Sequence, residues 1–297
     1  MKLPRIIITI ALIFSSNAFA KEVLVGVVEQ AQDCQKQGKF SARIMFVKQG
    51  TEWNALGADL PSTKWNIDNI NWEVAFDGKS LGHLSIKEPS TSVKYINDWY
   101  YHRDKKQALV ENQKFPKIRN KPGAFAGWCS GPEYRPLVLV SENHYKDPQG
   151  WKPFTAGPEY QDKLYPFLKV VVGRLNSIVC RPNEDVLSVP YIYRPRDTVI
   201  YKSYKSSSGQ VLISIGLNVK DFSCELIMPP EWSNNWFLIS GNDIDYLGRQ
   251  MELVDAGDSD GDGKSELLFW HSGYNNDGYV LVYNNFHQKA EYLWGYH

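Results

Sequence analysis

Residues 254–270 read VDAGDSDGDGKSELLFW, an acidic, glycine-rich stretch that runs directly into an apolar strand. Carboxylates stand at alternate positions 1, 3 and 5 of a short loop, a glycine follows at position 6, and another carboxylate closes the loop at position 9. Together with the main-chain carbonyl at position 7, these oxygens can surround one hard cation. The loop predicts Ca²⁺ as its cofactor, because Ca²⁺ accepts about six to eight oxygens in flexible geometry and Mg²⁺ does not. The expected metal ligands are Asp258, Asp260, Asp262, Lys264 through its carbonyl, and Glu266.

Two other interpretations of this loop are an EF-hand and an empty turn. An EF-hand places its bidentate acid at position 12, where this chain has Phe269, and the flanking residues resemble strands rather than helices. The second alternative is an empty Asp/Gly turn on a solvated surface. It has to explain three carboxylates within five residues, whose repulsion destabilises a compact turn unless a cation or open solvent compensates. The sequence therefore favours a calcium loop that is not an EF-hand.

The stretch from Val254 to Leu267 resembles the calcium loop of the FG-GAP and VCBS repeat family, in which D-x-D-G-D-G-x-x-D/E leads directly into an apolar strand. The resemblance covers Glu252 to His297 and implies one repeat at residues 249–297, whereas Lys21 to Met251 contains no second loop of this kind. In that family the repeats form blades of β-propellers, and the loops carry Ca²⁺ as a structural ion. The resemblance therefore implies a propeller-like blade and the same five calcium ligands.

The rest of the chain consists of short β-branched and aromatic runs separated by Gly, Pro, Asn and Asp, which is typical of an all-β protein. The expected strands are Val23 to Val28, Ala42 to Lys48, Trp72 to Phe76, Leu81 to Ile86, Leu137 to Ser141, Leu168 to Gly173, Ile178 to Arg181, Thr198 to Tyr204, Val211 to Leu217, Phe222 to Met228, Trp236 to Ser240, Glu266 to Trp270, Tyr279 to Tyr283 and Glu291 to Tyr296. The last three predict a C-terminal three-stranded meander entered by the calcium loop.

No linker or low-complexity tract divides residues 21–297, so we expect a single all-β domain. Two architectures stay open for it. The first is a set of β-propeller-like blades, each of ~40 to 45 residues, which together would account for the length of this domain. Packed antiparallel sheets are the alternative.

Residues 1–20 have the features of a secretory signal peptide. Two basic residues precede the apolar run Ile6 to Phe14, and Ala18-Phe19-Ala20 matches the small-x-small cleavage pattern. The apolar run is far shorter than the ~20 residues needed to span a bilayer. We therefore expect cleavage after Ala20, a periplasmic or secreted protein, and no membrane span in the mature chain.

Four cysteines, an even number in an oxidising compartment, predict two disulfides with three alternative connectivities. The pairing Cys180–Cys224 is favoured because both residues lie in or just after strand-like runs of one β-rich stretch, which leaves Cys34–Cys129. The 33 basic and 33 acidic residues balance, so the charge gives no support to nucleic acid as a partner.

The commonest enzyme signatures are missing: the sequence has no G-x-S-x-G, no H-E-x-x-H, no phosphate-binding loop and no dinucleotide fingerprint. We therefore expect an exported, calcium-stabilised β-rich protein that is non-enzymatic and binds a protein or glycan partner. The alternatives are a secreted polysaccharide hydrolase or lyase with a structural calcium, and an envelope structural protein.

A second polar segment follows the apolar strand Leu137 to Val140 and places acid, base and aromatic groups on one loop. Loops on a rigid β scaffold are where binding groups tend to sit. The candidate ligand residues are His144, Tyr145, Lys146, Asp147 and Trp151. The alternative is a solvated turn in which Trp151 covers the core.

Overall fold

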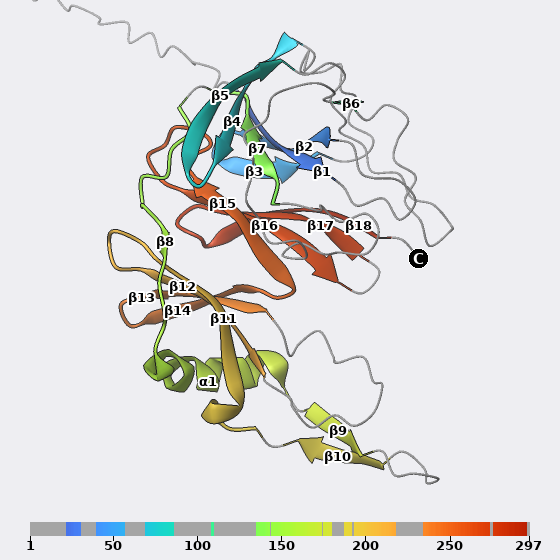
Figure 1. Cartoon of the computed structure of the whole chain (residues 1–297), viewed down its shortest axis with the longest axis vertical. Coiled ribbons are helices and arrows are strands. Elements are labelled where there is room, and N and C mark those ends of the chain that lie inside the picture. The colour runs from blue at the N-terminus through green and yellow to red at the C-terminus, as the bar shows by residue number, and fades with distance from the viewer. Residues whose placement is uncertain are drawn as a thin grey trace, which may run out of the picture.

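The computed structural model of the chain describes residues 22–30, 40–56, 69–85, 108–109, 135–142, 144–173, 175–179, 187–191, 193–217, 234–273 and 276–295. These residues lie mainly in antiparallel strands, with a single α-helix among them (Figure 1). The expected all-β fold is confirmed in coarser form, since the described residues are mostly β-strand and include one α-helix. No helix in this part of the chain is long and apolar enough to cross a membrane.

Sheet 1 has the strand order β3-β2-β1-β7-β4-β5, and β6 pairs with β2 off this path. Its strands are β1 (Val23–Gln30), β2 (Phe40–Gln49), β3 (Glu52–Ala55), β4 (Asn71–Phe76), β5 (Lys79–Ser85), β6 (Ala108–Leu109) and β7 (Leu137–Val140). The β4–β5 hairpin turns at Asp77 and Gly78, whose φ angles of 53° and 65° are those of a tight hairpin turn.

Sheet 2 has the order β14-β13-β12-β11-β8. Its strands are β8 (Lys152–Pro153), β11 (Thr198–Lys205), β12 (Val211–Leu217), β13 (Asn235–Ser240) and β14 (Asp243–Gly248). Helix α1 (Pro158–Val172) lies between β8 and β11 in the chain, and a two-stranded ribbon of β9 (Leu175–Val179) and β10 (Leu187–Tyr191) follows it. A single 3₁₀ turn, Pro195–Asp197, leads into β11.

Sheet 3 is a meander of β15 (Met251–Gly257), β16 (Glu266–Gly273), β17 (Asn276–Tyr283) and β18 (Gln288–Gly295), paired in chain order. The expected three-stranded meander is present as β16 to β18. Strand β15 was not expected, and it makes the sheet four-stranded. The acidic loop is the connection between β15 and β16.

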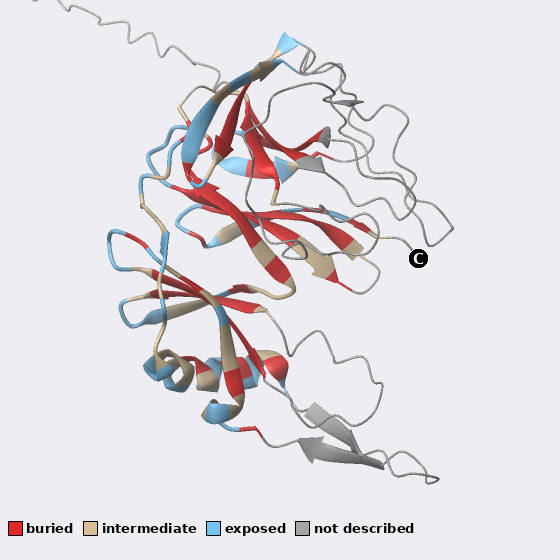
Figure 2. Cartoon of the chain, in the orientation of Figure 1, coloured by how far each residue is buried: buried red, intermediate tan, exposed pale blue. Residues whose placement is uncertain are grey.

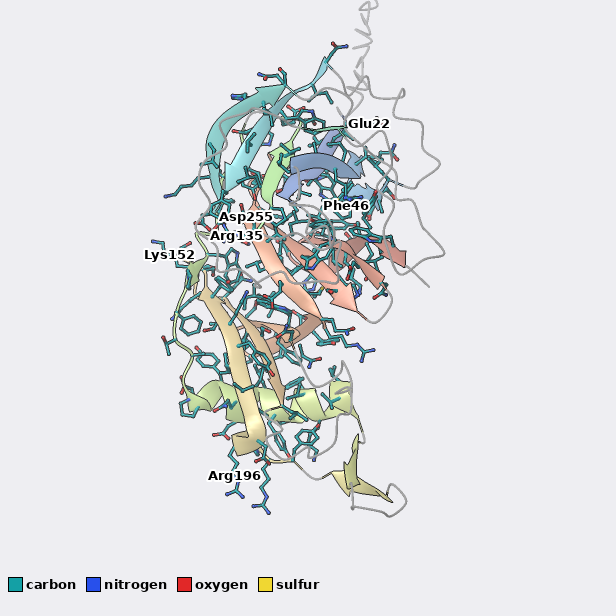
Figure 3. All side chains as sticks on the ribbon, turned by 45° about the vertical axis from the view of Figure 1, so that its right-hand side comes forward. Glu22, Phe46, Arg135, Lys152, Arg196 and Asp255 are labelled. Carbon is teal, nitrogen blue, oxygen red and sulfur yellow. The ribbon has the colours of Figure 1, made fainter. Side chains whose placement is uncertain are left out.

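The three sheets are stacked, with sheet 3 between the other two and α1 on the outer face of sheet 2 (Figures 1 and 2). In β17, Tyr279 and Leu281 pack against sheet 1, whereas Val280 and Val282 pack against sheet 2. At the interface with sheet 1, the ring of Phe46, labelled in Figure 3, lies near that of Tyr292 in an edge contact that places their centroids 6.4 Å apart. Because both faces are buried at the centre of sheet 3, β16 and β17 contain the continuous apolar runs Leu267 to Trp270 and Tyr279 to Tyr283, whereas the edge strand β18 alternates buried and exposed residues.

The expected strand from Leu168 to Gly173 is wrong, because these residues form the end of α1. Leu164, Leu168 and Val172 recur every four residues, so they share one helix face, and that face is buried against sheet 2. Pro158 at the first helical position and Gly173 at the C-cap mark the ends of the helix. Packing of this face outweighs the strand preference of the three consecutive valines.

Several sequence predictions fall outside the described residues. These are the signal peptide at residues 1–20, the strand from Phe222 to Met228, and both disulfides, since Cys34, Cys129, Cys180 and Cys224 are all beyond the described ranges.

Candidate metal centre

The acidic loop connects β15 to β16 at the side of sheet 3 that faces sheet 1. Gly257 and Glu266 are paired across the two strands, so residues 258–265 form the connection between them. Three side chains of this loop offer carboxylate oxygens that all lie within 4.8 Å of one another: Asp258, Asp260 and Asp262. The structure thus brings together the three aspartates that the sequence predicted as ligands.

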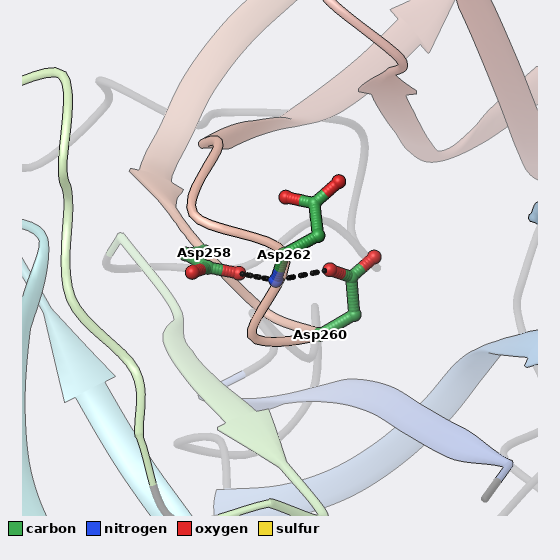
Figure 4. A group of neighbouring side chains, drawn as sticks. All are labelled: Asp258, Asp260 and Asp262. Carbon is green, nitrogen blue, oxygen red and sulfur yellow. Dashed lines mark hydrogen bonds between the residues drawn. The ribbon is translucent and has the colours of Figure 1, made fainter. Parts of the chain in front are cut away.

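Backbone N–H groups of the loop orient the carboxylate of Asp258, which is 2% exposed. Gly261 and Asp262 donate to its Oδ1 at 2.6 and 3.1 Å, and Gly263 donates to its Oδ2 at 2.9 Å. Figure 4 shows the carboxylates of Asp258 and Asp260 on either side of the amide of Asp262. The loop is therefore wound around the carboxylate at its first position.

Two glycines allow this winding. Gly261 and Gly263 have φ angles of +77° and +85°, in the left-handed region that side chains with a Cβ rarely adopt. The N–H of Lys264 donates to Oδ1 of Asp262 at 2.8 Å, so the expected carbonyl ligand belongs to the same tight turn. Asp262, Gly263 and Lys264 are exposed, which leaves this end of the loop open to solvent.

Glu266, the fourth carboxylate of the loop, is only 4% exposed and does not belong to the group of three whose oxygens lie within 4.8 Å of one another. Its Oε2 accepts the N–H of Ser259 at 2.8 Å, which links the two ends of the loop. Burial raises the pKa of Glu266 well above its usual range, and the negative charge of Asp260 raises it further. The hydrogen bond from the N–H of Ser259 lowers this pKa, but by less. Asp258 and Asp262 also raise this pKa, so all three loop aspartates act electrostatically on Glu266.

One cation from sheet 1 reaches the centre. The ammonium of Lys48, on β2, forms an ion pair with Oδ2 of Asp260. The same ammonium lies 5.9 Å from the ring centroid of Trp53. Sequence reasoning missed Lys48, since it is 212 residues away from Asp260 and no motif connects them.

The candidate ligand loop lies directly against the acidic loop, which the sequence did not predict. The N–H of Asp258 donates to the carbonyl of Lys146 at 2.7 Å, and the hydroxyl of Ser265 donates to Oδ1 of Asp147 at 2.6 Å. Lys146 also forms isolated β-bridges with both Lys79 and Asp258. Residues 144–147 therefore connect the β4–β5 hairpin of sheet 1 to the acidic loop of sheet 3.

Two side chains of this segment contact glycines of sheet 3 and its loop. A Cβ on Gly257 would lie 2.3 to 2.6 Å from ring atoms of Tyr145, and a Cβ on Gly261 would lie 2.9 Å from Nε2 of His144. Tyr145 is 5% exposed, and its N–H donates to Oε2 of Glu73 at 2.8 Å. Tyr145 thus packs in the core, and only the absence of a side chain at Gly257 leaves room for its ring.

Trp151 is half-buried at the interface of sheets 2 and 3. Its ring meets that of Phe286 edge-on, with centroids 6.0 Å apart, and its backbone N–H donates to Oδ2 of Asp147 at 2.6 Å. Of the five candidate ligand residues, Lys146 alone is classed as exposed, while His144, Asp147 and Trp151 are partly buried.

A buried acid beside the centre, Asp255, was not predicted as a functional residue. It is 6% exposed, and its Oδ1 accepts the N–H of Gly78 at 2.9 Å and that of Ala256 at 2.8 Å. Burial raises the pKa of Asp255 to about 7, although the guanidinium of Arg135 and the two N–H groups lower it. Figure 3 shows Arg135 and Asp255 in the same region of the molecule.

A scan of the chain against protein-family models gave no match, and searches among curated proteins and among solved structures gave none either.

Proposed function

We propose that the loop from Asp258 to Glu266 binds Ca²⁺ as a structural ion. The observation that carries the proposal is the convergence of three carboxylates, whose oxygens lie within 4.8 Å of one another, on a loop that ends at the buried carboxylate of Glu266. Buried negative charge is costly unless a cation compensates it. Lys48 supplies one positive charge, and a divalent cation bound by oxygen ligands would balance much of the remainder.

We further propose that sheet 3 is a single FG-GAP/VCBS-like repeat, comparable to one blade of a β-propeller. Its four strands pair in chain order, its two faces are covered by neighbouring sheets, and the acidic loop joins its first two strands. Four-stranded sheets packed face to face are the building units of propellers. This arrangement supports the resemblance that the loop sequence indicates.

The function that these features support best is that of an exported, non-enzymatic protein whose calcium-stabilised β scaffold binds a protein or glycan partner. The export part of the proposal rests on the signal-like residues 1–20. A calcium ion surrounded by the oxygens of this loop has few open positions, so its role would be to hold the loop and strands in register.

Thermal unfolding with and without Ca²⁺ tests the proposal. A ligand that binds only the folded state adds about 2.7 kcal/mol at one hundred times its dissociation constant, which raises the melting temperature measurably. Asp260→Ala should abolish the response to Ca²⁺, whereas Asp243→Ala, which removes an exposed acid on β14, should preserve it. Equal melting temperatures of the wild type in excess Ca²⁺ and in chelator would refute the calcium proposal.

Lys48→Met should strengthen Ca²⁺ binding, whereas Asp260→Ala should abolish it. In the wild type the ammonium of Lys48 competes with a bound cation for Oδ2 of Asp260, so removal of the ammonium should lower the dissociation constant for Ca²⁺ in a direct titration. Weaker binding by Lys48→Met would show instead that Lys48 holds Asp260 in the ligand position.

A further inference from the structure

A cavity of about 410 Å³ lies beside the outer edge of sheet 2, away from the acidic loop. It is lined by residues 153–156, which run from β8 towards α1, and by residues 200–204 of β11. Figure 3 shows Lys152 of β8 and Arg196 of the 3₁₀ turn near the two ends of this edge. Sites for small ligands have volumes of about 300 to 1,000 Å³, so the cavity has room for one small ligand unit.

A β-bulge directs an aromatic side chain to this cavity. On β11, Ile200 pairs with Ile215 and Lys202 with Ser214, so Tyr201 is an extra residue without a partner on β12. Bulges re-aim side chains and are frequent at sheet edges beside binding sites. The side chain of Tyr201 is 44% exposed, although it lines the cavity. The bulge therefore leaves a tyrosine ring accessible to a ligand.

The same edge is closed to an added peptide strand. The N–H of Phe154 already donates to the carbonyl of Ser203 at 3.1 Å, and the amide of Gln161 donates to the carbonyl of Thr198 at 2.7 Å. The bulge between these two points interrupts the regular ladder that strand addition needs. The occupant must therefore use side chains and the ring face.

The residues that line the cavity favour an uncharged ligand. Lys202 is the one charged residue among the residues that line the cavity, and its ammonium pairs with Glu252. The other lining groups include the exposed hydroxyl of Thr155 and the apolar ring of Phe154, whereas the hydroxyl of Ser203 already donates to the carbonyl of Phe154. An aromatic face with an exposed hydroxyl near it and no uncompensated charge suits a ligand that has both C–H faces and hydroxyl groups.

We propose that this cavity binds a neutral sugar residue of a glycan, with the pyranose ring stacked on Tyr201. The proposal rests on the proposed function as a binding protein and assigns it a glycan ligand and a site.

Titration with neutral oligosaccharides tests the assignment. Chitotriose, cellotriose and maltotriose are added to the full mature chain, and binding is followed by saturation-transfer NMR and calorimetry. We expect at least one to bind, with roughly tenfold weaker binding by Tyr201→Ala, because the stacking surface is lost. Tyr201→Phe keeps the ring and should retain most of the affinity.

Tyr246→Ala is the matched control, since Tyr246 is 42% exposed on β14 at the opposite edge of the same sheet. It should leave the affinity unchanged. Absence of binding by all three sugars, or equal binding by wild type and Tyr201→Ala, would overturn the assignment. Melting in Ca²⁺ and in chelator, recorded on the same samples, separates this result from a failure of the calcium proposal.

Discussion

Replacement of Asp255 by asparagine should make the protein less sensitive to pH between 4 and 8. In the folded chain the pKa of this buried carboxyl is about 7, compared with 3.8 for the exposed group. The largest cause is burial, which disfavours the charged form more than Arg135 and two N–H donors favour it. Asp255→Asn keeps an oxygen acceptor for the N–H groups of Gly78 and Ala256 but cannot ionise.

The sign follows from proton binding in the two states. Since the folded-state pKa is raised, the folded state binds the proton more tightly than the unfolded state does. The free energy of unfolding therefore falls as the pH rises from about 4 to about 7, and it is constant above that range. A difference of about 3 pKa units corresponds to about 4 kcal/mol, which is the upper limit of the loss.

Urea denaturation at pH 4, 5.5, 7 and 8, in buffer with chelator, measures this effect. The free energy of unfolding of Asp255→Asn minus that of the wild type should increase with pH by up to about 4 kcal/mol. Asp243→Asn, at an exposed position on β14, should show a constant difference. A constant difference would mean that folding leaves the pKa of Asp255 unchanged, and a difference that decreases with pH would mean that its charged form is stabilised; either result would refute the argument from burial.

Two further predictions concern the contacts around the centre. Gly257→Ala should destabilise the protein by about 1 to 3 kcal/mol, because the new Cβ would overlap the buried ring of Tyr145; urea denaturation measures this, and a variant as stable as the wild type would show that the ring can move aside. Trp151→Ala should lower the free energy of unfolding by about 2 kcal/mol, roughly half the cost of removing a fully buried tryptophan, because the ring is half-buried against Phe286. If thermal melting shows a loss of less than about 1 kcal/mol, the result favours the interpretation of Trp151 as a surface ligand residue.

The strands that the sequence predicts best are those that can be recognised from their own residues alone. Strand β12 is apolar except at Ser214 and Gly216, and β16 contains the continuous apolar run Leu267 to Trp270, so these buried strands can be recognised from short apolar runs alone. Strand β15 carries two acids among its seven residues and was missed. One of them, Asp255, is buried because Gly78 of a distant hairpin donates to it, and this compensation is not visible in a local pattern.

The convergence of Asp258, Asp260 and Asp262 is predicted well because the three aspartates lie within five consecutive residues. The surroundings of the acidic loop are not predicted, because they come from β2 and from residues 144–147, far away in the chain. The same limit explains the misassigned end of α1. The four-residue spacing of Leu164, Leu168 and Val172 matters only because sheet 2 offers an apolar face to bury it.

A cation bound at the proposed calcium site would stabilise more than sheet 3, because the contacts of the acidic loop reach all three sheets. Asp260 is joined to sheet 1 through Lys48, and Ser265 is joined to Asp147. Asp147 in turn accepts the N–H of Trp151, which leads into β8 of sheet 2. A cation that fixes the carboxylates of the loop would therefore oppose separation of sheet 1 and sheet 2 from sheet 3 as well as fraying of the β15–β16 connection. The proposed site therefore lies where the three layers of the described structure meet.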